Sequence, residues 1–141
     1  MKDRKTIKIG DNVETEFDIL ESNIEKFSLV SGDFNPIHLD ENYAKNTYFK
    51  KRIAHGMYVA SFISSVIAEK MPGRGSIYLG QNLKFLRPVF IGDLITVYIE
   101  FIDIVNHKNM KLVTNCFNQD SIKVIEGDAL VLPPTNVTIK G

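Results

Sequence analysis

The sequence predicts an α+β fold in which a curled antiparallel sheet of about five strands wraps around one central buried helix, at about residues 55–69. Two observations predict this fold. The helix at 55–69 is apolar on nearly all sides, so other elements have to cover it. The chain also contains several stretches with the apolar–polar alternation of half-buried strands. A sheet curled around the helix satisfies both patterns.

The first part of the chain predicts one strand followed by short helices. Residues 13–19 (VETEFDI) alternate apolar and acidic side chains, the pattern of a strand with one face in water. In residues 21–30, Ser22 and Glu25 have the spacing of a capping box, which predicts a short helix. Asp40 stands where an N-cap would begin a further helix. The side chains that the first helix is expected to bury are Ile24, Phe27 and Val30.

Four strand-like stretches follow the central helix and are separated by short turn-like segments. Their boundaries are residues 76–90, 93–105, 110–118 and 121–132. In the second of them, Ile95, Val97, Ile99 and Phe101 share one face, which marks that face as core. An antiparallel sheet curled around a helix is the outline of a hot-dog fold. Such a sheet keeps its edges, and pairing two subunits would cover one of them, so we expect a homodimer.

Composition excludes several classes of function. The 141 residues are the length of one domain, taken as 1–141, and the 17 basic and 17 acidic residues balance. No global field therefore favours nucleic acid or an anionic membrane. Cys116 is the one cysteine, so the chain has no internal disulfide, and we expect this residue to be buried and inert. No cluster of residues has metal-ligand spacing. Without a signal-peptide pattern or a bilayer-long apolar stretch, we expect a cytoplasmic protein with no membrane partner.

Residues 31–40 (SGDFNPIHLD) bring an acid, an amide, a proline and a histidine close together. Pro36 fixes its own backbone and keeps Asn35 out of the helical region, so Asp33 and His38 do not share one helix. The bend could bring both side chains into one cleft, where a carboxylate and an imidazole suit proton transfer. The alternative is structural: Asp33 satisfies backbone amides in a turn, and His38 is a hydrogen-bonded core histidine.

Residues 52–61 (RIAHGMYVAS) place His55 and Gly56 where the central helix begins. The start of a helix carries unpaired amides and partial positive charge, which suit an anion or a polarised carbonyl group. Gly56 would let a substrate carbonyl approach the backbone closely. The alternative is tight packing of the helix start against a strand. Taken alone, this stretch leaves both readings open, and His55 is expected to order the helix start.

Three stretches together resemble the MaoC-like, (R)-specific enoyl-CoA hydratase family. They are FSLVSGDFNPIHLD, RIAHGMYVASFISS and LGQNLKFLRPVFIGD, and the resemblance covers roughly residues 20–105. Within the first stretch, Gly-Asp-x-Asn-Pro-x-His is the specific motif. Two features depart from the usual family pattern. Lys50 and Lys51 stand where small residues are usual, and they either meet the phosphates of coenzyme A or form a solvated face. Tyr58 stands where an aliphatic residue is common, and its ring could shorten the acyl pocket.

The resemblance implies a homodimer of hot-dog subunits that binds acyl thioesters of coenzyme A. It implies catalytic roles for Asp33 and His38, and thioester binding by the amide of Gly56. It also places Ser64, two turns along the central helix, and Asn35 among the substrate-binding residues, and Asn35 is expected to hold the loop rather than to perform chemistry. The implied reaction is reversible hydration of trans-2-enoyl-CoA to (R)-3-hydroxyacyl-CoA, with short acyl chains favoured. No cofactor is implied, because coenzyme A is part of the substrate.

Two other functions are compatible with this fold. Hot-dog domains also serve as acyl-CoA thioesterases, but those relatives typically lack the Asp-x-Asn-Pro-x-His stretch. A non-catalytic acyl-CoA-binding protein would fit a chain that has the fold without the acid–base pair. Because this chain carries both Asp33 and His38, the sequence favours the hydratase.

Overall fold

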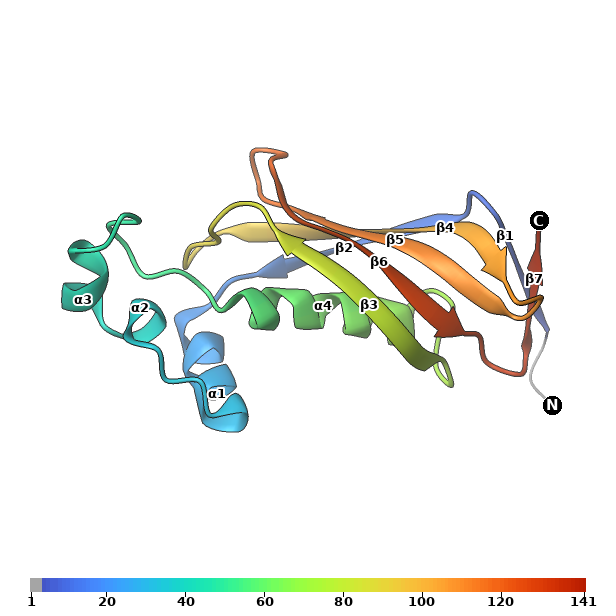
Figure 1. Ribbon diagram of the computed structural model, residues 1–141, viewed down its shortest axis with the longest axis horizontal. Helices are drawn as coiled ribbons and strands as arrows, with labels where there is room; N and C mark the ends of the chain where they lie inside the picture. Colours follow the sequence, from blue (N-terminus) through green and yellow to red (C-terminus); the bar gives the residue numbers. More distant parts are fainter. Residues whose placement is uncertain (1–3) are drawn as a thin grey trace.

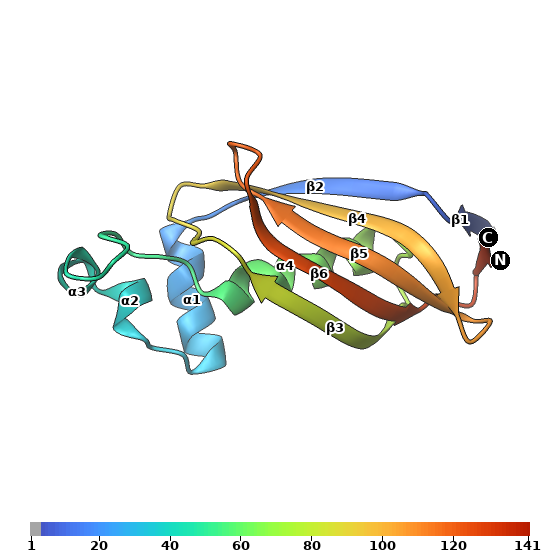
Figure 2. The same ribbon diagram turned by 45° about the horizontal axis from the view of Figure 1, so that its top comes forward.

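The computed structural model describes residues 4–141 and has a five-stranded antiparallel sheet curled along helix α4 (Figures 1 and 2). The strand order is β2-β4-β5-β6-β3, so β2 and β3 form the two edges. This is the predicted arrangement. The elements are β2 (Asn12–Asp18), α4 (Gly56–Glu69), β3 (Ile77–Phe85), β4 (Leu94–Val105), β5 (Asn109–Phe117) and β6 (Lys123–Leu132).

The hydrophobic core lies between the concave face of the sheet and α4. Alternate residues of β4 point into it, as predicted: Ile95, Val97, Ile99 and Phe101 are all fully buried. Each large apolar side chain removed from water in this way contributes about 1.5–3 kcal/mol to stability. On β5, burial raises the pKa of Cys116 to about 12, which agrees with the expected inert thiol.

Helix α4 is not covered on all sides within this chain. Val59, Ile63 and Val66 are buried, but Met57 is 60% exposed and Ser64 is also exposed. The expectation of a helix buried nearly all round was therefore too broad, because the sheet curls around one side only. No helix in residues 4–141 has the length and hydropathy needed to cross a membrane.

Residues 20–55, which we call the overhanging segment, lie beyond one end of the sheet (Figures 1 and 2). The segment carries helices α1 (Glu21–Ser31), α2 (Pro36–Leu39) and α3 (Glu41–Lys45). Asp40 caps α3 as predicted, because its side chain accepts a hydrogen bond of 3.1 Å from the amide of Tyr43.

The predicted capping box of α1 is wrong. The helix begins at Glu21, so Ser22 lies inside its first turn and the N-cap, Leu20, makes no side-chain capping bond. Ile24 is buried as predicted, but Val30 is 88% exposed, because α1 turns only one narrow face toward the rest of the chain.

Strands β1 (Lys5–Lys8) and β7 (Val137–Lys140) form a separate parallel pair that the sequence did not reveal. Each has only four residues, too few for a clear alternation. The pair lies at the end of the molecule opposite to the overhanging segment (Figure 1).

Candidate active site

An apolar cavity of about 490 Å³ opens where the overhanging segment meets the first turn of α4. Asp33 and His38 line it from the overhanging segment, and Gly56 and Met57 line it from α4. The apolar walls include Ile53, Val59, Phe85, Val89, Val124 and Ile125. The cavity therefore combines a few polar groups with a mostly apolar lining, which is typical of sites for small organic ligands.

Asp33 follows directly after the end of α1. Gly32 ends that helix with φ +80°, a left-handed conformation that glycine adopts without strain. One carboxylate oxygen of Asp33, Oδ1, accepts a hydrogen bond of 3.1 Å from the amide of Asn35. Asp33 thus makes the local turn that the structural reading predicted, and its second carboxylate oxygen remains for a ligand in the cavity.

His38 is held on α2, a helix of one turn. Asn35 caps this helix, because its Oδ1 accepts a hydrogen bond of 3.3 Å from the amide of Ile37. Nδ1 of the buried His38 ring lies 2.7 Å from the carbonyl oxygen of Ile53. A carbonyl oxygen only accepts hydrogen bonds, so Nδ1 carries the hydrogen and Nε2 is the free nitrogen.

His55 lies against His38, with ring centroids 4.0 Å apart and 29° between the ring planes. Its Nε2 is 3.2 Å from the carbonyl oxygen of Asp33 and 3.0 Å from Oγ of Ser28. Burial lowers the pKa of His55 and outweighs the raising effect of the bond to Asp33; the neighbouring His38 lowers it further. The folded environment of His55 therefore favours the neutral ring, and the ring contacts both His38 and the main chain of Asp33.

One nitrogen or carboxylate oxygen from each of Asp33, His38 and His55 lies within 4.8 Å of the other two. The sequence suggested that Asp33 and His38 meet but indicated no cluster with metal-ligand spacing, because His55 lies outside their motif. The two imidazole rings stack with 29° between their planes, and Nε2 of His55 already lies within hydrogen-bond distance of the carbonyl oxygen of Asp33 and of Oγ of Ser28. This geometry suits proton transfer better than a shared metal ion.

Gly56 begins α4 beside the cavity. The amides of Tyr58 and Val59 donate to the carbonyl of His55, at 3.1 and 3.2 Å, so the amides of Gly56 and Met57 precede the first intrahelical bonds. A Cβ atom at Gly56 would lie only 2.7 Å from a ring carbon of Phe85. Gly56 therefore packs tightly against β3, as the packing alternative expected, and it also lines the cavity.

Ser64 does not join Asp33 and His38. It lies farther along α4 in a second hollow, which it shares with Phe27, Tyr78 and Leu79. Met57 lines both hollows, so the two adjoin. Tyr58 packs against the rings of Phe27 and Phe62 and does not line the cavity beside Asp33.

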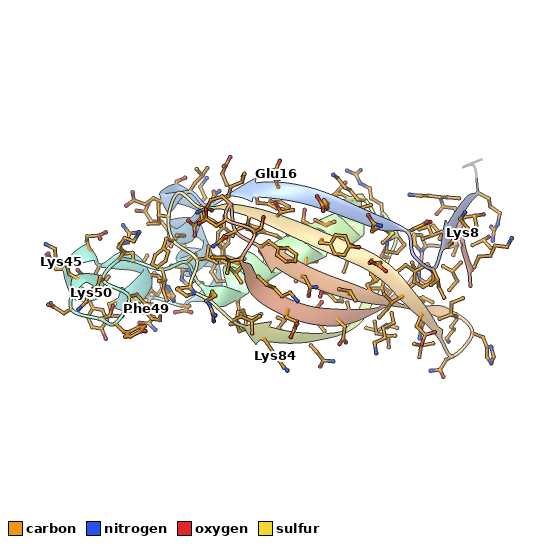
Figure 3. The ribbon with its side chains drawn as sticks, turned by 90° about the horizontal axis from the view of Figure 1, so that it is seen from above. Lys8, Glu16, Lys45, Phe49, Lys50 and Lys84 are labelled. Carbon is orange, nitrogen blue, oxygen red and sulfur yellow. The ribbon has the colours of Figure 1, made fainter. Side chains whose placement is uncertain are left out.

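The lysines before the helix have different surroundings. Lys51 places its Nζ 4.4 Å from the ring centroid of Phe90, a cation–π contact. Lys45, Phe49 and Lys50 lie together in the overhanging segment, well separated from Lys84 on β3 (Figure 3). Phe49 lines the cavity, whereas Lys45, Lys50 and Lys84 do not.

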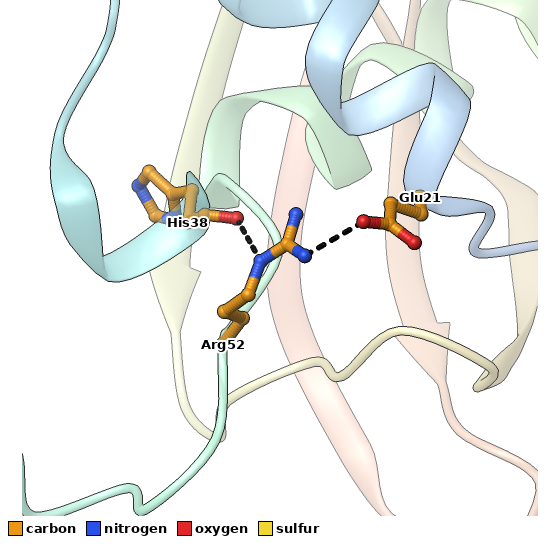
Figure 4. Close-up of polar contacts among 3 residues, drawn as sticks. All are labelled: Glu21, His38 and Arg52. Carbon is orange, nitrogen blue, oxygen red and sulfur yellow. Dashed lines mark hydrogen bonds and ion pairs between the residues drawn. The ribbon is translucent and has the colours of Figure 1, made fainter. Parts of the chain in front are cut away.

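Sequence reasoning missed Arg52. Its Nε donates to the carbonyl oxygen of His38 and its Nη1 to a carboxylate oxygen of Glu21, both at 2.8 Å (Figure 4). Arg52 is 9% exposed, so it is a buried charge with defined partners. Along the sequence it follows Lys50 and Lys51 and is indistinguishable from a run of surface charges.

Fold and site together define a hot-dog protein with a carboxylate and an imidazole at an apolar cavity beside the start of its central helix. Comparison with known proteins agrees with this class. The MaoC like domain matches residues 4–120, and the chain belongs to this family.

Similar proteins include curated enzymes and solved structures. The chain is 43% identical over 129 residues to an (R)-specific enoyl-CoA hydratase of Rhodospirillum rubrum, covering 91% of this chain and 89% of the relative. It is 40% identical over 118 residues to a 3-hydroxybutyryl-CoA dehydratase of Methylorubrum extorquens, covering 83% and 74%. The structure of an R-hydratase from Pseudomonas aeruginosa superposes with a TM-score of 0.87 at 42% identity, covering 91% and 83%.

Proposed function

We propose that this protein catalyses the reversible hydration of trans-2-enoyl-CoA to (R)-3-hydroxyacyl-CoA. The observation that carries the proposal is that Asp33 and His38 both line one apolar cavity. The names of the relatives support it, because they describe an (R)-specific enoyl-CoA hydratase and a 3-hydroxybutyryl-CoA dehydratase, and hydration and dehydration are the two directions of one reaction.

In the forward direction, Asp33 and His38 divide the proton transfers. Asp33 takes a proton from a bound water while the water oxygen forms a bond to the β-carbon of the enoyl thioester. The carbon–carbon π electrons move toward the carbonyl group, and protonated His38 gives the proton on Nε2 to the α-carbon. The proton on Asp33 then passes to His38, which restores both groups for the next turnover. Dehydration uses the same steps in reverse.

The amide of Gly56 has the role of stabilising the thioester oxygen as negative charge develops on it. One such donor is worth about 10²–10³ in rate, and a positioned acid or base about 10²–10⁴. Because these groups supply acid, base and charge stabilisation, the reaction needs no cofactor beyond the coenzyme A that the substrate carries. Ser64 is proposed to contact substrate in the adjoining hollow, and Asn35 to hold the loop of Asp33.

The substrate carries a short acyl chain in this proposal, and the active form is a homodimer of single-domain subunits. Support for the dimer comes from β3, an edge strand with exposed apolar side chains that include Ile77, Leu79 and Phe85. A cytoplasmic location stays a prediction from the sequence.

The decisive experiment follows the near-ultraviolet absorbance of crotonyl-CoA with the purified protein, because this absorbance reports the conjugated enoyl thioester. A free-thiol assay on the same sample reports hydrolysis. We expect loss of conjugation without thiol release, and a loss of activity of at least about 10²-fold in Asp33→Asn, which keeps the side-chain shape without the base. Thiol release would identify a thioesterase instead. Full activity in Asp33→Asn would refute the role of this residue.

A further inference from the structure

His38 lies on a helix that cannot fix its own position. Helix α2 has only four residues, and isolated helices far longer than this are marginal in water. Yet proton transfer requires His38 to keep a set distance and direction from Asp33 and the substrate. Contacts from other parts of the chain must therefore hold α2 in place.

Residues 52–54 supply these contacts on one side. The carbonyl of Ile53 accepts from Nδ1 of His38 at 2.7 Å, and the amide of Ile53 donates to the carbonyl of Ile37 at 3.3 Å. The amide of Ala54 donates to the carbonyl of Val89 at 2.7 Å, which ties these residues to the segment leading into β4. The imidazole ring is thus held from the body of the fold.

Arg52 holds the main chain of His38 from a second direction. Its Nε donates to the carbonyl oxygen of His38, which belongs to the last turn of α2 and so lacks an intrahelical partner. Its Nη1 donates to Glu21, in the first turn of α1. Helix α1 ends at Ser31, and its C-cap, Gly32, immediately precedes Asp33. The guanidinium therefore connects the helix that carries the histidine to the helix that leads into the aspartate (Figure 4).

We infer that Arg52 is a positioning residue for the hydration reaction: it fixes the main chain of His38 relative to α1 and thereby relative to Asp33. This inference rests on the proposed function. Arginine suits the role because its planar guanidinium carries donors that point in different directions, whereas a lysine ammonium is a single point. Arg52 itself does not line the cavity.

The test compares Arg52→Met and Arg52→Lys with the wild type in the crotonyl-CoA assay. Because a misplacement of about 1 Å can cost about 10²-fold in rate, we expect kcat of Arg52→Met to fall about 10- to 100-fold. KM should change by less than about threefold, since Arg52 makes no contact with the cavity. Arg52→Lys keeps the positive charge and one of the two contacts, so its kcat should lie between that of Arg52→Met and that of the wild type.

The chain offers a matched control in Arg74. This residue also forms an ion pair, with Glu69 at 3.0 Å, but beyond the opposite end of α4 and with its side chain 80% exposed. We expect Arg74→Met to keep the wild-type kcat and KM. Thermal unfolding of all variants shows whether each is folded at the assay temperature.

A double-variant cycle separates positioning from general support of the fold. If Arg52 acts through His38, then Arg52→Met should reduce kcat strongly in the wild type but hardly at all in His38→Asn. An equal loss in both backgrounds, or a kcat for Arg52→Met within threefold of the wild type, would overturn the inference alone. Absence of hydration by the wild type would overturn the proposed function and this role with it.

Discussion

His55 is a buried histidine whose folded environment prefers the neutral ring. Burial lowers its pKa below the ordinary value of 6.5, and His38, stacked on it, adds repulsion whenever that ring is charged. Within residues 4–141, the buried Nδ1 of His55 has no hydrogen-bond partner, so a proton added there would be an unpaired donor. The opposing carboxylate and carbonyl of Asp33 only partly offset these effects.

We therefore predict that the protein loses stability as the pH falls below 6.5. The unfolded chain binds a proton on His55 near this pH, whereas the folded chain does so only at lower pH, so protonation favours unfolding. The contribution of neutral His55 to the free energy of unfolding is therefore complete above pH 6.5. It is lost as the pH falls through the lowered pKa of His55 in the folded protein. Thermal unfolding between about pH 5 and 8 measures the effect.

The variants His55→Gln and His107→Gln give the comparison that assigns this effect. Glutamine at 55 can still donate to the carbonyl of Asp33 but does not titrate, so the acid-side decline should become shallower. His107 is exposed in the hairpin turn between β4 and β5, and its replacement should leave the decline unchanged. An unchanged decline in His55→Gln would contradict the assignment.

At the scale of single residues, the sequence allowed prediction of those site members that a short motif brings together. Asp33 and His38 are five positions apart, and the proline between them bends the chain. Arg52 could not be found in this way, because its partners lie 14 and 31 positions away. Only the folded chain shows that these residues meet.

At the scale of elements, the pairing of β3 with β6 leaves no room for a side chain at Gly127. A Cβ atom there would lie 2.2 Å from the carbonyl oxygen of Asn82, which belongs to the backbone of β3 and cannot move independently. We predict that Gly127→Ala lowers the free energy of unfolding by about 1–3 kcal/mol or more, measured by urea denaturation.

Gly80, on β3 itself, is the control for this prediction. A Cβ atom there would meet nothing within 4 Å, and its φ is not in the left-handed region. Gly80→Ala should therefore leave stability nearly unchanged or slightly raised, because alanine has fewer unfolded conformations to lose. Equal losses in both variants would mean that the close approach at Gly127 is not the cause.

The elements that the sequence predicted well are those whose patterns are long. Strand β4 has 12 residues and a clear alternation, so both its existence and its buried face could be read from the sequence. The pair of β1 and β7 joins two four-residue segments from opposite ends of the chain, and no local pattern indicates such pairing. The start of α1 was misplaced because a capping-box spacing also occurs by chance inside a first turn.

At the scale of the whole molecule, the two edges of the sheet differ in a way that matters for assembly. On β2, residues Glu14, Glu16 and Asp18 are exposed, and acidic side chains discourage pairing with another strand (Figure 3 labels Glu16). On β3, Ile77, Leu79 and Phe85 are each about half exposed. The β3 edge is therefore the one expected to meet a second copy.

We predict that the protein elutes at twice the mass of its 16.0 kDa chain, measured by light scattering coupled to size-exclusion chromatography. A lysine at position 79 would place an unpaired charge among the apolar side chains of β3, so Leu79→Lys should shift the population to monomer. Glu16→Lys changes charge on the opposite edge and should remain dimeric. A monomeric wild type, or a dimer that Leu79→Lys leaves intact, would show that β3 does not form the interface.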